Sequence, residues 1–337
     1  MYAATASTLI VLAAALVVDW ALGEYPAPLH PVVWIGKVIG AAMRLAPRQG
    51  RWRQMFFGAL LALGICTLSA GATFLVLRWV ADWPIVEIVA GTFFLKSSFA
   101  LWELKRAADR VIQPLQRGKL EQAREALRSL CSRDPTCLDE TALLSAVVSS
   151  LAENLCDSFI APLCYWTIFG VPGAMGYRAV NTLDAMIGYR GRFEFVGKSA
   201  ARLDDAANWL PARLTAGLLL LAGCLTGKNV AAAWRSLRRD GAKTPSPNGG
   251  RPMSVMAGFL GVQLEKKGVY LLGDPQYPLT PQKVRQAWLL VCIAAMLVVI
   301  LCGLAAATLA GASLYNPFIG VLRCEAFHTW ASCWSRP

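Results

Sequence analysis

The chain has 337 residues, of which 56% are hydrophobic and only 16% are charged, and its mean hydropathy is +0.46. This composition argues against two water-soluble domains and predicts one membrane-embedded unit. The net charge of +12 is spread over loops between apolar runs, as expected of basic residues that face anionic membrane lipid. The sequence shows no basic face with interleaved aromatic residues, so we expect no nucleic acid partner.

Four apolar runs are long enough to cross a bilayer. They cover Tyr2 to Leu22, Met55 to Val80, Ile85 to Trp102 and about Ala287 to Leu309. The first run has no Lys or Arg before it and no cleavage site, so we interpret it as an uncleaved span. The fold class that we expect is all-α: a polytopic integral membrane protein with about four transmembrane helices, broken or re-entrant helical segments and cytoplasmic helices.

The distribution of basic residues predicts the orientation. Segments 23–54, 103–141, 171–210 and 227–286 carry five, eight, five and ten Lys or Arg residues respectively. The positive-inside rule places all four segments in the cytoplasm. Thr141 to Gly170 and Leu214 to Thr226 would then have both ends on one side, so each must enter the membrane and return. We expect the first to turn near Pro162, and to border a cavity beside Glu153 and Asp157 that satisfies its backbone.

Two other features bound the organisation. The segment Glu103 to Glu140 has the apolar spacing of an amphipathic cytoplasmic helix, followed by Arg133 and Asp134 before a proline. We expect one catalytic domain over residues 1–311, and the tail 312–337 shows no pattern. Ten cysteines form no CxxC pair, and there are two histidines, so neither a disulfide framework nor a histidine-rich metal site is expected.

The densest group of polar residues lies between Ser149 and Arg213. It contains Glu153, Asn154, Asp157, Arg178, Asn181, Asp184, Arg202, Asp204, Asp205, Asn208 and Arg213. Ionisable groups are costly to bury near a membrane, so this concentration indicates a functional site. Three pairs are three or four residues apart and share a helix face: Glu153 with Asp157, Arg178 with Asn181, and Asp204 with Asn208. Salt bridges that hold helices together are the alternative interpretation.

Four motifs carry a resemblance to a known family. They read SSLAENLCDSFIAPLCYW from Ser149, YRAVNTLDAMIGYR from Tyr177, ARLDDAANWLPAR from Ala201 and SPNGGRPMSVMAGFLGVQLEKKGVYLLG from Ser246. Together they closely resemble the CobD/CbiB family of adenosylcobinamide-phosphate synthases, integral membrane enzymes of cobalamin biosynthesis. The resemblance extends from about Asp19 to about Gly273. One departure precedes the HPV motif, where the family tends to read LGDP and this chain reads LGEY from Leu22.

The resemblance implies a reaction and its partners. The reaction is ATP-driven amide formation between a propionate carboxylate of adenosylcobyric acid and (R)-1-aminopropan-2-ol or its O-phosphate. ATP is then a co-substrate with Mg²⁺ as its metal ion, and the enzyme lies among lipids of the cytoplasmic (inner) membrane with its active site facing the cytoplasm. The oligomeric state is left open. A membrane transporter or binding protein for corrinoids with the same polar residues is the alternative function.

The residue types suggest roles within such a reaction. We assign catalysis to Glu153, Asp157, Asp184, Asp204 and Asp205. We also assign metal binding to Asp204 and Asp205, because carboxylate oxygens are ligands that Mg²⁺ prefers. Substrate binding is assigned to Arg178, Asn181, Arg202, Asn208, Arg213, Ser246, Asn248, His30 and Lys198. A wide corrinoid ring also requires a broad aromatic seat, for which Tyr165, Trp166, Tyr177, Tyr189 and Trp209 are candidates; an aromatic belt at the lipid interface is the alternative.

The substrate-binding assignments rest on different arguments. Arginines can bind phosphate through two hydrogen bonds, and the turn SPNGG from Ser246 can cradle an anion. Lys198 lies in GRFEFVGKS, which is not a Walker motif because five residues separate its glycines. For His30, a structural hydrogen bond beside Pro31 is the alternative to a part in the chemistry.

Overall fold

The computed structural model describes residues 2–131, 134–188 and 194–311. Predictions that concern Arg133, Tyr189 and the tail 312–337 lie outside this part of the chain. The helices are α1 (Tyr2–Leu22), α2 (Pro31–Met43), α3 (Arg51–Trp79), α4 (Pro84–Ser98), α5 (Leu101–Gln116), α6 (Leu120–Leu127), α7 (Glu140–Leu155), α8 (Ala161–Ile187), α9 (Glu194–Ala207), α10 (Trp209–Leu225), α11 (Val230–Asp240), α12 (Gly250–Leu260) and α13 (Pro281–Gly311). A 3₁₀ turn, Ala27–Leu29, precedes α2, and a π turn, Cys156–Ile160, joins α7 to α8.

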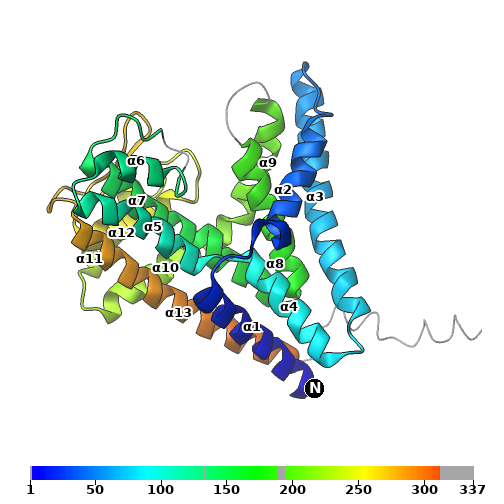
Figure 1. The fold of residues 1–337 in the computed structure, drawn as a ribbon. Coiled ribbons are helices and arrows are strands. Elements are labelled where there is room, and N and C mark those ends of the chain that lie inside the picture. Colours follow the sequence, from blue (N-terminus) through cyan, green and yellow to red (C-terminus); the bar gives the residue numbers. More distant parts are fainter. Residues whose placement is uncertain (1, 132–133, 189–193, 312–337) are drawn as a thin grey trace, which may run out of the picture.

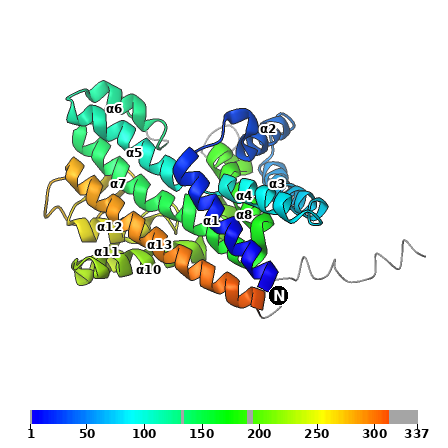
Figure 2. The same cartoon turned by 60° about the horizontal axis from the view of Figure 1, so that its bottom comes forward.

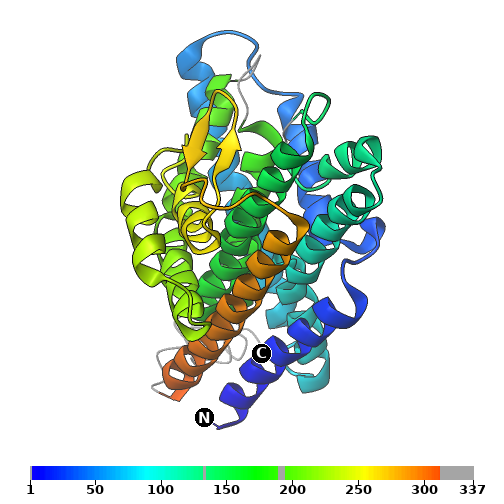
Figure 3. The same cartoon turned by 90° about the vertical axis from the view of Figure 1, so that its left-hand side faces the viewer.

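The expected all-α class is confirmed, with one small addition. Strands β1 (Leu264–Lys266) and β2 (Tyr270–Leu272) form an antiparallel hairpin in which Leu264 pairs with Leu272. Both of these leucines are fully buried. The hairpin is best seen beside α12 and the start of α13 in Figure 3.

Four helical segments are long and apolar enough to cross a membrane. They are Arg51–Trp79, Pro84–Gln116, Glu140–Ile187 and Pro281–Leu309. Three of the four expected spans are among them. The expected span Tyr2 to Leu22 forms α1 with those bounds, but its apolar part, Ala6–Leu22, is shorter than these four segments. The fourth segment is instead Glu140–Ile187, whose backbone does not run straight.

The chain folds back at Gly170, within α8. Gly170 has φ 67° and ψ −166°, a conformation that is essentially restricted to glycine. The rings of Tyr165 and Tyr177 stack with centroids 5.0 Å apart, whereas twelve residues of straight helix would separate them by about 18 Å. The expectation of an entering and returning segment is therefore right in kind. The predicted turn near Pro162 is wrong, because the helix continues from the π turn through Pro162. The missing N–H of Pro162 is tolerated, since the carbonyls of Asp157 and Ser158 accept hydrogen bonds from Tyr177 and Ala100 instead.

The second predicted re-entrant segment has a different form. Residues 214–226 belong mostly to α10, which is uninterrupted and meets α9 at a bend of 47° beside Asn208. Residues 214–226 are too few to cross a membrane alone, but α9 and α10 together are long and apolar enough to form one broken span. The prediction that this short segment turns within itself is therefore wrong.

The returning helix pair occupies the centre of the molecule. In the segment Glu140–Ile187, 78% of the most apolar 18 residues are buried, against 22% in Arg51–Trp79. Figure 1 shows α3 at the edge with α2 and α9 beside its upper part, whereas α5, α6, α11 and α12 group on the opposite side. Figure 2 shows α1 and α13 running along one face next to α7 and α8. The apolar side chains that α3 exposes, such as Leu60, Leu63, Leu68 and Leu75, are those expected to face lipid.

A buried carboxylate ties the helical part to the hairpin. Asp240, at the end of α11, binds Arg239 and Lys243 at 2.8 and 2.7 Å and accepts the backbone N–H of Gly273 at 2.8 Å. Burial opposes ionisation, but the hydrogen bonds from Arg239 and Lys243 prevail and lower the pKa of Asp240 to about 2. The carboxylate therefore stays charged and fixes the residue that follows β2.

We expect Gly170→Ala to destabilise the protein through its backbone alone. A Cβ at Gly170 would approach no atom closer than 3.7 Å, so space is available, but the conformation costs a non-glycine residue about 1–3 kcal/mol. The measurement is the thermal midpoint of the purified protein in detergent. Gly71→Ala in α3 is the control, because a Cβ there meets nothing within 4 Å and alanine favours a helix. Equal midpoints for the two variants would contradict the proposed strain at Gly170.

Candidate active site

The π turn at Cys156–Ile160 sets the position of Asp157. A π turn displaces the regular helical hydrogen bonds, so nearby carbonyl oxygens require other donors. The Asp157 carbonyl accepts the hydroxyl of Tyr177 at 3.2 Å, and the Ser158 carbonyl accepts the backbone N–H of Ala100 at 3.0 Å. We call residues 140–169, before the reversal at Gly170, the entering limb, and residues 171–187, after it, the returning limb. The first of these bonds joins the entering limb to the returning limb. The second joins the entering limb to the break between α4 and α5.

Asn208 connects the returning limb to the bend between α9 and α10. Its side-chain oxygen accepts the Tyr177 hydroxyl at 2.8 Å, and its amide nitrogen donates to Asp204 Oδ2 at 3.0 Å. Asn208 is only 1% exposed, so each of these bonds replaces contact with water. The spacing of four between Asp204 and Asn208, expected to place both on one helix face, is therefore realised as a direct hydrogen bond.

A second chain of hydrogen bonds reaches Asp204 from α8. Arg178 Nη1 donates to Asn181 Oδ1 at 3.1 Å, and Asn181 Nδ2 lies 3.5 Å from Asp204 Oδ1. Arg178 Nε is buried without a hydrogen-bond partner among the described residues. The predicted pair Arg178 and Asn181 thus shares a helix face and points toward the carboxylates.

The turn SPNGG from Ser246 closes another side of the same site. Ser246 Oγ donates to Asp205 Oδ1, and Asn248 Nδ2 donates to the Asp205 carbonyl, both at 2.8 Å. Gly249 lies directly against Glu153, because a Cβ there would come within 2.7 Å of Glu153 Oε1. A turn that begins 41 residues after Asp205 therefore touches both Asp205 and Glu153.

These contacts define one site, which we call the central polar cluster. It comprises Glu153, Asp157, Tyr177, Arg178, Asn181, Asp184, Asp204, Asp205, Asn208, Ser246 and Asn248. The charge of Asp204 acts on both Asp157 and Asp184, and so does that of Glu153. Five carboxyl groups beside one arginine make the cluster acidic, which suits a metal-bound phosphate or an ammonium group better than a bare anion.

The carboxylates form no ready-made metal centre. In residues 2–131, 134–188 and 194–311, no three His, Cys, Asp or Glu side chains are grouped so as to hold a metal ion. The adjacent Asp204 and Asp205 have different partners, namely Asn208 and Ser246. This arrangement fits an ion such as Mg²⁺ that takes one or two protein carboxylates and completes its shell with substrate phosphates and water.

Comparison with known proteins identifies the family. The model of the family described as CobD/Cbib protein matches residues 12–291. The cobalamin biosynthesis protein CobD of Dehalococcoides mccartyi is 42% identical over 82% of this chain and 90% of its own length. The probable cobalamin biosynthesis protein CobD of Thermococcus kodakarensis is 41% identical over 85% of this chain and 93% of its own. This chain belongs to the CobD/CbiB family. No solved structure matches it.

Membership of this family makes the chain a cobalamin biosynthesis protein. The central polar cluster contains ten of the site residues that were proposed from the sequence. Three others lie away from the cluster's hydrogen bonds. Arg202 is exposed; Lys198 is half exposed and pairs with Glu194 at 3.0 Å; and the guanidinium of Arg213 lies 3.9 Å from the ring centroid of Trp209. Of the aromatic candidates, Tyr177 joins the cluster and Tyr165 stacks on it, whereas Trp166 is fully buried and Trp209 is half exposed.

His30 belongs to a separate network in this CobD/CbiB protein, which we call the lysine network. Lys96 is fully buried and lies 2.8 Å from Glu24 and 3.2 Å from Asp19. His30 Nε2 contacts Glu24 at 2.5 Å, while its Nδ1 accepts the Val32 N–H as the N-cap of α2. Partial burial opposes ionisation of Glu24, but the bond to His30 and the charge of Lys96 lower its pKa. His30 thus makes the hydrogen bonds of a structural residue beside Pro31, and the glutamate of LGEY pairs with the buried lysine.

Sequence reasoning did not assign Lys96 or Asp19 to any site. The available signal was a lone lysine within the apolar run Ile85 to Trp102, since an isolated charge in a span requires a partner. The lysine network also adjoins the central polar cluster, because the charge of Glu24 acts on Arg178.

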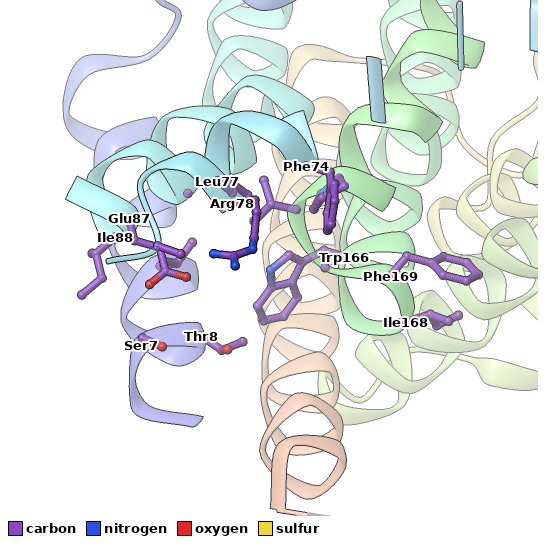
Figure 4. A pocket seen from close by; sticks show the side chains of 16 residues that line it. Ser7, Thr8, Phe74, Leu77, Arg78, Glu87, Ile88, Trp166, Ile168 and Phe169 are labelled. Carbon is purple, nitrogen blue, oxygen red and sulfur yellow. The ribbon is translucent and has the colours of Figure 1, made fainter. Parts of the chain in front are cut away.

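Two cavities lie outside the central polar cluster. The first, of about 150 Å³, is lined by Thr8, Arg78, Glu87, Trp166 and Gly170, among others, and Figure 4 shows Arg78 and Glu87 projecting into it from neighbouring helices. It lies beside the Gly170 turn, thirteen residues or about 20 Å of helix beyond Asp157. The second, of about 480 Å³, is lined by Asp134, Ser145 and the β1 residues Glu265 and Lys266. Neither is the predicted cavity beside Glu153 and Asp157.

We expect Lys96→Met to destabilise the protein strongly, because it leaves Asp19 and Glu24 buried without their cation. Breaking a buried ion pair from one side typically costs about 3–5 kcal/mol. The measurement is the thermal midpoint in detergent. The triple change that adds Asp19→Asn and Glu24→Gln should recover part of the loss. Lys105→Met is the control, since Lys105 pairs with Asp109 at a solvent-accessible position. A midpoint for Lys96→Met equal to that of the control would refute the assignment.

We expect Ser246→Ala and Asp205→Ala to be coupled rather than additive. Each removes the same hydrogen bond, and such bonds to charged groups are worth about 1.5–3 kcal/mol. The double variant should therefore lower the thermal midpoint by clearly less than the sum of the two single changes. Additive shifts would show that Ser246 and Asp205 do not interact.

Proposed function

We propose that this chain is the ligase that joins adenosylcobyric acid to (R)-1-aminopropan-2-ol or its O-phosphate, giving adenosylcobinamide or its phosphate. ATP supplies the driving force and Mg²⁺ accompanies the nucleotide. Family membership supports the pathway and the corrinoid substrate. The observation that carries the reaction class is the central polar cluster, in which five carboxyl groups from three separate segments act on one another and the buried Arg178 connects to Asp204 through Asn181.

The chemistry requires two steps that this cluster can assist. First, a carboxylate oxygen of the corrinoid attacks the γ-phosphorus of ATP, so that ADP leaves and an acyl phosphate forms. Second, the amine nitrogen attacks the acyl carbon and inorganic phosphate leaves. A protein carboxylate must accept the proton that the amine releases, and we assign this to Glu153 or Asp157. Asp204 and Asp205 would hold Mg²⁺, which neutralises phosphoryl oxygens when it is bound.

Each other residue would have a supporting part in this proposal. Asn208 and Asn181 hold Asp204 from two sides, so its oxygens stay oriented without a counter-charge. Ser246 does the same for one oxygen of Asp205. Arg178 offers a guanidinium that is already desolvated, and it would face carboxylate or phosphate oxygens of the substrate.

We place the site on the cytoplasmic side of the inner membrane, where nucleotide is available. The basic segments predict this orientation, since 23–54, 103–141 and 227–286 hold most of the Lys and Arg residues. The Gly170 turn supports it, because it shares a pocket with Arg78 and Glu87, which flank the short link between α3 and α4. In this orientation the link and the turn lie on the outer side, and the central polar cluster lies toward the cytoplasm.

A turnover assay of the purified protein in detergent tests the function. The reactants are adenosylcobyric acid, Mg²⁺, ATP and either amine, and both corrinoid product and ADP are measured. We expect Asp157→Asn and Asp204→Asn to lower kcat by about 10²–10⁴, the range for loss of a proton-transfer group or an electrostatic stabiliser. Glu125→Gln, an exposed change on α6, is the control for altered charge. Normal turnover by both site variants would refute the assignment.

A corrinoid transporter is the competing function, and the fold-back at Gly170 favours it, because broken helices beside polar residues are typical of secondary transporters. Uptake into proteoliposomes separates the two. Accumulation of an unaltered corrinoid, without ADP release or amide product, would support transport and contradict the ligase.

A further inference from the structure

Two arginines lie near the N-terminal ends of the neighbouring helices α10 and α12. A Cβ on Gly223, near the end of α10, would lie 2.1 Å from the ring of Phe259, near the end of α12. Arg213 is ten residues before Gly223, and Arg251 is eight residues before Phe259. Because these distances along the two helices are similar, packed helices that run the same way place both arginines at one end. Consistent with this, the charge of Arg251 acts on Arg213.

Neither guanidinium is neutralised by the protein. No salt bridge joins Arg213 or Arg251 to an acidic side chain within the described ranges. Arg213 donates to the Trp209 carbonyl at 2.5 Å and stacks on the Trp209 ring, which fixes its plane. Two like charges placed together without a counter-ion repel each other, so the arrangement is stable only if an anion binds there or water screens it.

A buried donor within the pair points to a ligand. Arg251 Nε is buried and has no hydrogen-bond partner in the part of the chain that the structure describes. A buried N–H of a charged group is costly to leave unsatisfied. Asn248 Oδ1, three residues earlier, is likewise buried without a partner among the described residues, and it can accept a hydrogen bond from a bound hydroxyl or amine. The N-terminus of α12 adds partial positive charge beside Arg251.

The pair is connected to the central polar cluster through the turn that precedes it. Residues 246–250 bind Asp205 through Ser246 and Asn248 and touch Glu153 through Gly249, and Arg251 follows directly. Arg178, by contrast, is subject to the negative charges of Glu24 and Asp157. An acidic cluster therefore adjoins an uncompensated basic pair, and a phosphate-bearing substrate can bridge them with its phosphate on the arginines.

We propose that Arg213 and Arg251 form the site that binds the phosphate oxygens of a soluble substrate. This rests on the proposed function for the identity of that substrate, which is either the nucleotide or the phosphorylated amine. Arg251 is then a substrate-binding residue that motif reasoning did not assign. Trp209 is a positioning residue, which holds the Arg213 guanidinium flat for two parallel hydrogen bonds.

The first experiment measures binding without catalysis. The full chain, in detergent, is titrated with radiolabelled pyrophosphate. We expect Arg251→Gln and Arg213→Gln each to weaken binding about tenfold to a hundredfold, the effect of losing a hydrogen bond to a charged group. Arg251→Lys should retain part of the affinity, because it keeps the charge but loses the fork, and it covers the case in which glutamine impairs folding. Arg238→Gln, an exposed arginine on α11, is the matched control. Binding that is unchanged in both glutamine variants overturns the proposal.

Competition distinguishes the sources of the phosphate. Displacement of pyrophosphate by MgATP, or by aminopropanol O-phosphate but not free aminopropanol, supports the proposal and identifies the substrate. A pair that binds only phosphatidylglycerol in nanodiscs, with no response to soluble phosphates, overturns it in favour of a lipid contact. Pyrophosphate binding that depends on the pair, together with no amide product in the turnover assay, would leave this site standing and refute the proposed ligase reaction.

Discussion

The hydroxyl of Tyr177 makes the contacts on which the rest of the site depends. It reaches the Asp157 carbonyl on the entering limb and the Asn208 side chain at the bend between α9 and α10. Three segments that are far apart in sequence are thereby held together in a region with little water. A buried hydroxyl, amide and π-turn carbonyl each require a partner, and here they satisfy one another. The carboxylates of Asp157 and Asp204 are held in place as a consequence.

That arrangement is available only because the chain reverses at Gly170. A straight helix from Glu140 to Ile187 would carry Tyr177 about 30 Å from Asp157, since twenty residues separate them. The fold-back needs one residue with a backbone conformation that other amino acids avoid, and it lies at the far end of the hairpin from the polar residues. The strained backbone at Gly170 therefore lies away from the residues of the central polar cluster. The reversal does not disturb the helical backbone that positions their side chains.

Three polar groupings surround this core and differ in charge. The central polar cluster is acidic, and the lysine network balances its buried Lys96 with Asp19 and Glu24. Arg213 and Arg251 form a basic group that has no acidic partner among the residues that the structure describes. The turn from Ser246 touches the first and leads directly into the third. A substrate with both a cationic and an anionic end would therefore meet complementary charges at neighbouring positions.

The sequence by itself determined the class of the protein, most of its spans and most of the cluster's members. Hydropathy is a local property, and polar residues in an apolar chain identify themselves, so Asp204, Asn208 and Arg178 could be selected without coordinates. The family motifs led to the CobD/CbiB assignment for the same reason. The tertiary structure decided which residues meet: the turn at Gly170 instead of Pro162, the partnership of Glu24 with Lys96, and the pairing of Arg213 with Arg251. Those contacts depend on the direction in which a chain returns and on which helix faces pack together, and composition and spacing do not encode either.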